Sequence, residues 1–111
     1  MTALIIAELK FIEEILGNQT EVANYLKIEP SKLAGWKKGD CAPSDEIEER
    51  IVELRLVIVK LRAIYSDDVI LGWLLGSNPM VNFCRPLDLI AKGRLVEVLN
   101  AIEQEKAGSY A

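Results

Sequence analysis

The chain has 111 residues, half of them apolar and only 6% aromatic, with 13 basic and 17 acidic residues. A chain of this length forms one domain, or two small subdomains that share a core. Its net charge of -4 argues against binding nucleic acid by bulk attraction. It has no histidine, the usual proton-transfer group near neutral pH and the commonest metal ligand, so we expect neither an enzyme nor a metal site or cofactor.

The sequence shows no signal-peptide arrangement and no apolar run near the roughly 18 residues that a membrane span requires. We therefore expect a cytoplasmic protein without a membrane partner. Cys41 and Cys84 lie far apart and form no C-x-x-C motif, which favours two free thiols.

Three helices are predicted in the first forty residues. The first covers residues 2–16, because its apolar positions recur every three or four residues at Leu4, Ile5, Leu9, Ile12, Ile15 and Leu16. Thr20 is expected to cap a second helix that ends near Leu26. Glu29 and Pro30 are expected to open a third helix, which Gly39 closes.

A longer helix is predicted from Ser44 or Asp45 to about Tyr65, with Asp45 and Glu48 spaced as a capping box. One apolar stripe contains Ile47, Ile51, Leu54, Ile58, Leu61 and Tyr65, and a second contains Val52, Leu56, Val59 and Ala63. Two stripes exceed what one small core can cover. We expect this helix to pack against both halves of the chain or against a second copy in a homodimer.

The remaining sequence predicts further helices and no strand. Ser66 should cap a helix that ends at Gly76, Pro86 should start a short helix through Lys92, and a final helix should cover residues 94–107 until Gly108 releases it. Between these helices, residues 77–93 look like an irregular connector, yet they carry more apolar side chains than a solvated loop tolerates.

The stretch QTEVANYLKIEPSKLAGWKKG has the spacing of a helix-turn-helix. Ala23 leaves room for a second helix, Ile28 occupies the turn, and Leu33 and Trp36 should pack back onto the first helix. The stretch resembles the Xre class of helix-turn-helix proteins. In this class the motif opens with Q-x-x-x-A and closes with a tryptophan, and the corresponding residues here are Gln19, Ala23 and Trp36. The resemblance implies contact with operator DNA.

The residues placed to meet DNA are Ser31 and Lys32 for base edges, and Gln19, Lys37 and Lys38 for phosphates. Lys27 stands where this class usually has its turn glycine, so a left-handed backbone there costs on the order of 1 kcal/mol. Residues 18–39 carry four lysines against Glu21 and Glu29, which predicts low affinity per copy. The alternative is a helix-turn-helix that only packs and no longer reads DNA.

From Trp73 onward, WLLGSNPMVNFCRPLDLIAKGRLVEVLNAI resembles the C-terminal domain of the MbcA/ParS/Xre antitoxin family. The matching positions are Trp73, Asn78, Pro86, Leu89, Gly93, Val98 and Leu99. The chain departs from the pattern at Phe83, where many members have a glycine, so we expect a different turn there. The resemblance implies an antitoxin that masks a RES-domain toxin, an NAD-consuming enzyme, and that helps to repress its own operon.

The candidate toxin-binding side chains lie in the connector and at the chain end. Leu87, Leu89 and Ile90 are expected in the core, while Met80, Phe83 and Arg85 fit the core and a binding surface equally well. In some members of the family the C-terminal tail enters the toxin's catalytic pocket, which gives a role to Ser109, Tyr110 and Ala111. The alternative for these three residues is a frayed chain end.

The predicted architecture is all-α, with an Xre-like helix-turn-helix in residues 1–43, a connecting helix and possible dimer interface in 44–65, and a small toxin-binding domain in 66–111. Two functions remain open. One is an antitoxin of a type II toxin–antitoxin system. The other is a stand-alone Xre-type repressor whose C-terminal half only dimerises the DNA-binding half.

Overall fold

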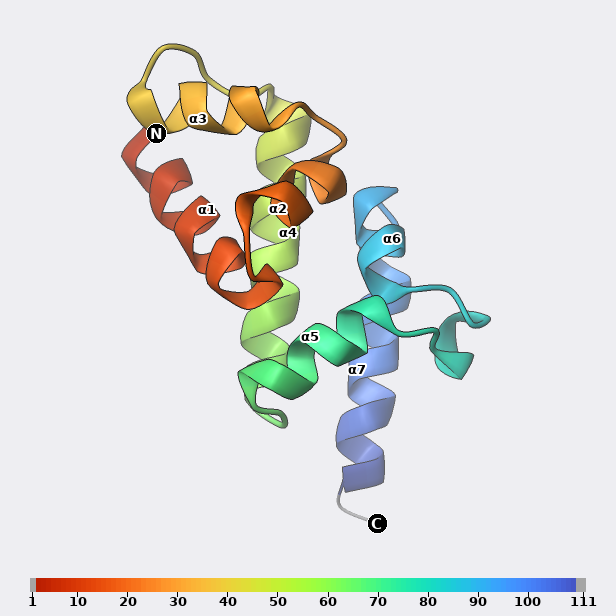
Figure 1. Ribbon diagram of the computed structural model, residues 1–111. Helices are drawn as coiled ribbons and strands as arrows, with labels where there is room; N and C mark the ends of the chain where they lie inside the picture. Colours follow the sequence, from red (N-terminus) through yellow and green to blue (C-terminus); the bar gives the residue numbers. More distant parts are fainter. Residues whose placement is uncertain (1, 110–111) are drawn as a thin grey trace. The chain divides into compact units, whose positions relative to one another are not determined.

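The computed structural model describes residues 2–109, with side chains from residue 5 to residue 108. Over this range the chain is helical and has no strand beyond an isolated bridge between Asn78 and Cys84 (Figure 1). The predicted all-α class is confirmed. The chain divides into two compact units, Met1–Arg55 and Leu56–Ala111, and α4 (Asp45–Arg62) contributes to both.

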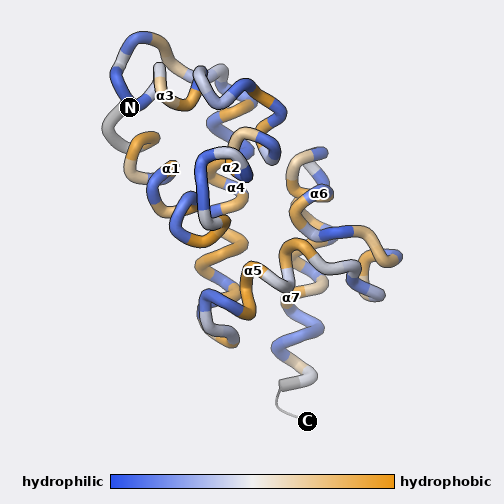
Figure 2. The backbone as a smooth tube through the Cα atoms, in the orientation of Figure 1, coloured by the Kyte–Doolittle hydropathy of each residue, from blue (hydrophilic) through white to orange (hydrophobic). Residues whose placement is uncertain are grey.

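The first unit contains α1 (Thr2–Leu16), α2 (Gln19–Leu26), α3 (Pro30–Lys38) and the start of α4. The apolar faces of these helices pack together to form the core of the unit. Along α1, apolar positions recur at helical spacing in Figure 2. The buried residues are Ile5, Leu9, Ile12, Ile15, Leu16, Val22, Ala23, Tyr25, Leu26, Leu33, Trp36, Ile51 and Leu54. The predicted inward positions of Ala23, Leu33 and Trp36 are confirmed.

Two helix caps differ from the prediction, although α4 begins where it was predicted. Asn18, not Thr20, caps α2, because its side-chain Oδ1 accepts a hydrogen bond from the Glu21 amide at 2.9 Å. The Ser44 hydroxyl oxygen accepts the Ile47 amide at 3.3 Å, so α4 begins from a serine cap and not from the Asp45 capping box. In both cases the residue just upstream of the predicted cap already satisfies a first-turn amide, and asparagine and serine are among the best caps.

Polar contacts tie α1 and α2 to α4 in the first unit. The Tyr25 hydroxyl donates a hydrogen bond to the Arg50 carbonyl oxygen at 2.7 Å, although the tyrosine ring is buried. Arg55 Nε lies 2.9 Å from Glu8 Oε2 in an ion pair that lacks hydrogen-bond alignment. The Arg55 guanidinium also lies 5.6 Å from the centre of the Phe11 ring. These contacts fix α1 and α2 on α4.

The second unit contains the end of α4, α5 (Asp67–Leu75), a 3-10 turn η1 (Pro79–Val81), α6 (Pro86–Ala91) and α7 (Leu95–Ser109). Helix α6 packs against both α5 and α7, and η1 packs against α7. The buried apolar residues are Val57, Ile58, Leu61, Ile70, Leu74, Val81, Leu87, Leu89, Ile90, Val98, Ala101 and Ile102. Leu87, Leu89 and Ile90 therefore belong to the core, as predicted.

The two stripes of α4 have different environments. Ile51, Leu54, Ile58 and Leu61 of the first stripe are fully buried. In the second stripe, Val52, Leu56 and Val59 are 50%, 39% and 45% exposed. The helix ends at Arg62, three residues before the predicted Tyr65. The Arg62 side chain donates two hydrogen bonds to the Asp67 carboxylate, with nitrogen–oxygen distances of 3.0 and 3.1 Å.

Within the described residues, no helix combines the length and the apolar character that crossing a membrane requires.

Replacing Tyr25 by Phe should lower the free energy of unfolding by about 1 kcal/mol near pH 7, because the hydrogen bond to Arg50 is lost in a buried place. Urea unfolding measures this, with the exposed Asn24→Ala on the same helix as a control that changes by less than about 0.5 kcal/mol.

The same variant should also change the pH dependence. Burial raises the pKa of Tyr25 above its ordinary value, despite the opposing effect of Arg50. Above about pH 10 the unfolded tyrosine ionises while the folded one stays neutral, so stability falls as the pH rises. Tyr25→Phe should show a smaller loss between about pH 10 and 11.5. An equal loss in both proteins would contradict this assignment.

Candidate functional site

The turn between α2 and α3 closes without glycine. Lys27 ends α2 in a left-handed conformation, with φ of 58°, and its amide bonds to the carbonyls of Ala23 and Asn24. The Ile28 amide also bonds to the Ala23 carbonyl, at 3.0 Å. The Lys27 and Ile28 amides thus donate hydrogen bonds to carbonyls that have no partner within the last turn of α2. The motif keeps its geometry although Lys27 occupies a backbone conformation that costs about 1 kcal/mol.

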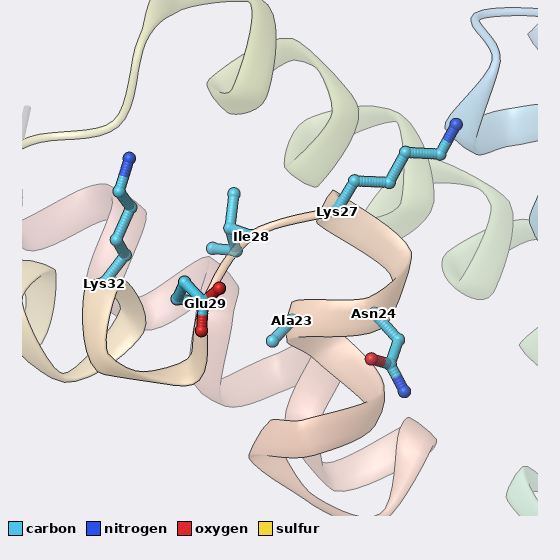
Figure 3. Close-up of a pocket in the computed structure, with 6 residues that line it drawn as sticks. All are labelled: Ala23, Asn24, Lys27, Ile28, Glu29 and Lys32. Carbon is cyan, nitrogen blue, oxygen red and sulfur yellow. The ribbon is translucent and has the colours of Figure 1, made fainter.

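Helix α3 presents its first turn to solvent. Glu29 precedes the helix without a side-chain capping bond and Pro30 takes its first position, so Ser31 and Lys32 follow as exposed residues. A hollow lies at the turn, lined by Ala23, Asn24, Lys27, Ile28, Glu29 and Lys32. Figure 3 shows the Lys27 and Lys32 side chains extending from opposite sides of the turn, with Glu29 between their attachment points. Asn24 and Lys27 are surface residues at this hollow, and the sequence pattern did not place either of them among the DNA contacts.

The predicted phosphate contacts are not equivalent. Gln19 and Lys38 are exposed, whereas Lys37 Nζ lies 2.5 Å from Glu13 Oε1, and both of these side chains are mostly buried. Lys37 is therefore engaged in an ion pair within its own unit. Residues 1–55 contain seven basic and eleven acidic residues, so any attraction for DNA in this unit must be local.

In the second unit, Asn78 organises the connector between α5 and α6. Its side-chain Oδ1 accepts the Met80 amide at 2.9 Å, and its carbonyl accepts the amides of Val81 at 3.1 Å and Phe83 at 2.8 Å. Its own amide donates to the Cys84 carbonyl at 3.1 Å. Asn78 is only 7% exposed, and Val81 at 5% anchors the loop in the core. The connector is therefore an ordered loop held from within.

This loop displays two apolar side chains. Asn82 and Phe83 both have left-handed backbones, with φ of 57° and 62°, a conformation that costs L-residues about 1–2 kcal/mol each. Phe83 is nevertheless 69% exposed, and Met80 is 43% exposed. The Phe83 backbone keeps a conformation that favours glycine, in spite of the aromatic side chain. We call Met80 and Phe83 the displayed pair.

Arg85 lies next to the displayed pair, at the start of α6. Its Nε is 3.6 Å from Asp88 Oδ2, and both side chains are about half exposed. An ion pair of this length and exposure contributes little to stability. Arg85 thus adds a charged group beside the displayed pair, and the loop brings all three predicted connector residues to the surface.

The chain end differs from the prediction. Helix α7 continues to Ser109, so Gly108 lies inside the helix and does not release it. A helix tolerates one glycine when the flanking turns continue their hydrogen bonds, at a cost of about 1 kcal/mol. Of the predicted tail, Ser109 is the last helical residue, and Tyr110 and Ala111 lie outside the described residues.

Comparison with known proteins identifies relatives over most of the chain. A probable mycobacterial cidal antitoxin of Mycobacterium tuberculosis is 30% identical over 92 residues, which cover 83% of this chain and 78% of the relative. The mycobacterial cidal antitoxin MbcA of Mycobacterium bovis is 25% identical over 99 residues, covering 89% and 88%. No family model matches the chain.

A solved structure also matches the chain over most of its length. The chain matches the crystal structure of the M. tuberculosis MbcT–MbcA toxin–antitoxin complex with a TM-score of 0.76 and 25% identity, covering 92% of this chain and 93% of the matched one. These relatives are antitoxins and not enzymes, which confirms the expectation of a non-catalytic protein.

Replacing Phe83 by Gly should leave the free energy of unfolding unchanged or raise it by up to about 1 kcal/mol. The substitution relieves a left-handed phenylalanine and removes a side chain that contacts mostly solvent. Chemical denaturation measures the effect, with Val81→Ala as the opposite control, since this buried neighbour should lose about 1–3 kcal/mol. A loss above about 1 kcal/mol in Phe83→Gly would show that the ring stabilises the fold.

Proposed function

The chain belongs to the family of the mycobacterial cidal antitoxins, and from this membership we propose that it neutralises a RES-domain toxin by binding to it directly. The toxin would be the NAD-consuming member of a type II toxin–antitoxin pair, and both proteins would act in the cytoplasm. The observation that carries the proposal is the exposure of the displayed pair, Met80 and Phe83, on a hydrogen-bonded loop. The loop keeps Phe83 exposed although its left-handed backbone conformation costs free energy.

A rigid apolar projection suits protein binding. Aromatic anchors contribute a large share of the energy of many interfaces, and a loop ordered in advance loses little conformational entropy on binding. The Asn78 hydrogen bonds supply this order before the partner arrives. The exposed guanidinium of Arg85 would add a polar contact at the rim of the same surface.

The chain end supplies a second proposed contact. We propose that Ser109, Tyr110 and Ala111 extend from α7 into the catalytic pocket of the toxin and obstruct its NAD site. Helix α7 continues to Ser109, which gives the tail a firm base. The displayed pair would then provide affinity, while the tail would provide inhibition.

The proposal includes repression of the chain's own operon. The exposed first turn of α3 supports it: Ser31 and Lys32 would meet base edges, and the exposed Gln19 and Lys38 would meet phosphates. Lys37 would contribute less, because Glu13 already neutralises it. The acidic balance of residues 1–55 keeps the proposed affinity per copy low.

Two copies would raise this affinity. We propose a homodimer through the second stripe of α4, whose Val52, Leu56 and Val59 are each more than one-third exposed. A two-fold dimer places two reading helices on one face of DNA, so the operator would contain two related half-sites about one helical turn apart.

The alternative function is a stand-alone Xre-type repressor, favoured by the intact turn geometry at Lys27. The two functions separate by mutation, because an antitoxin can lose DNA binding and still neutralise its toxin. They also differ in their protein partner, because an antitoxin requires a toxin encoded by a neighbouring gene and a stand-alone repressor does not.

Lys32→Ala should abolish repression of the chain's own promoter in a reporter assay while leaving rescue from the co-expressed toxin intact. Loss of one base contact costs about 1–3 kcal/mol, which is roughly a 5- to 150-fold loss of operator affinity. Phe83→Gly should do the reverse, since the loop is remote in sequence from α3 and the fold survives.

Lys92→Ala, which removes an exposed lysine outside the helix-turn-helix, serves as the charge-matched control and should affect neither assay. The antitoxin proposal would be rejected if the wild-type chain failed to rescue growth. Full repression by Lys32→Ala would instead reject the DNA-reading role.

Light scattering of the purified chain should give the mass of a dimer, and Leu56→Glu with Val59→Glu should convert it to a monomer by placing charge on the second stripe. Val96→Glu on α7 is the matched control, because this valine is 68% exposed and outside α4. A wild-type monomer at tens of micromolar would exclude a stable homodimer at that concentration.

A further inference from the structure

A small hollow lies beside the displayed pair in the second unit. It is lined by Gly72, Trp73, Gly76, Ser77, Asn78, Pro79, Met80 and Glu105. Its volume of about 220 Å³ is below the range typical of pockets for drug-sized ligands but suits a single side chain. Met80 belongs both to this hollow and to the displayed pair, so the two features form one continuous surface.

The lining of the hollow is chemically asymmetric. It contains one carboxylate, that of Glu105, and no basic side chain. Gly72 leaves open space where another residue would carry a Cβ atom, so an incoming group can approach the backbone of α5. Acidic and aromatic side chains therefore line the hollow together.

Glu105 is held in position by a tyrosine. The Tyr65 hydroxyl donates to Glu105 Oε2 at 2.6 Å, and this hydrogen bond, more than desolvation, raises the pKa of Tyr65. A carboxylate offers about four acceptor sites, so it can bind a further group while it keeps the partners it has. The contact fixes the direction of the carboxylate.

Trp73 contributes the aromatic wall. Its indole N–H is buried without an acceptor among the described residues, although a buried tryptophan usually finds one. No internal hydrogen bond therefore explains the placement of this ring at the edge of the hollow. An aromatic ring beside a fixed carboxylate is a combination that binds guanidinium and ammonium groups.

We propose that this hollow receives an arginine or lysine side chain of the toxin, next to the displayed pair. The inference rests on the proposed function and names the chemistry of the toxin at that point: a cation that projects beside an apolar pocket. Glu105 would pair with its charge, and the Trp73 ring would cover its face or stem.

The test uses the full chain and the RES-domain toxin of its own operon. Glu105→Gln removes the charge but keeps a carbonyl oxygen that accepts the Tyr65 hydroxyl. We expect at least a tenfold weaker toxin affinity, a shallower dependence of affinity on salt, and an unchanged thermal unfolding midpoint. Glu103→Gln on the same helix is the control, because Glu103 is exposed and does not line the hollow; its affinity should stay within about twofold.

A double-mutant cycle identifies the partner residue. Among alanine substitutions of the toxin's surface arginines and lysines, one should lose its effect in the Glu105→Gln background. Equal affinities for Glu105→Gln and Glu103→Gln would overturn the inference and leave the antitoxin function standing. A wild-type chain that binds no toxin would overturn both.

Discussion

The C-terminal unit depends on the hydrogen bonds of Asn78. Among the described side chains it is the only polar residue that is buried, and a buried amide costs free energy unless its groups are bonded. Asn78 meets this condition by bonding Met80 through its side chain, and Val81, Phe83 and Cys84 through its backbone. The bonds close the chain into a tight loop, and an apolar side chain at this position would leave the Met80 amide without its acceptor.

The consequence of this closure is an unusual exposure of apolar surface. A loop that ended in two left-handed residues could use glycines at no steric cost, yet the chain has Asn82 and Phe83 there. The displayed pair faces solvent, and the hollow beside Met80 presents the Trp73 ring. Exposed aromatic surface on a strained backbone favours association with another protein over stability of the isolated chain.

The N-terminal unit has well-anchored helices but little positive charge for attracting DNA. Tyr25 and Arg55 fasten α2 and α1 to α4, and Lys27 closes the turn. The unit nevertheless has more acids than bases, and Glu13 engages Lys37. A scaffold of this kind can place a recognition helix, but it gains affinity for DNA from a few side chains and from pairing of copies, not from its overall charge.

The sequence by itself determined the helical class, the limits of most helices and the family, because periodicity, caps and motif order are local properties of the chain. Sequence patterns also predicted which stripe residues of α4 are apolar, but not which stripe would be buried. That choice, the ion pair between Lys37 and Glu13, and the grouping of Trp73 with Glu105 depend on contacts between residues far apart in sequence. Such contacts exist only once the helices pack, so only the tertiary structure decided them.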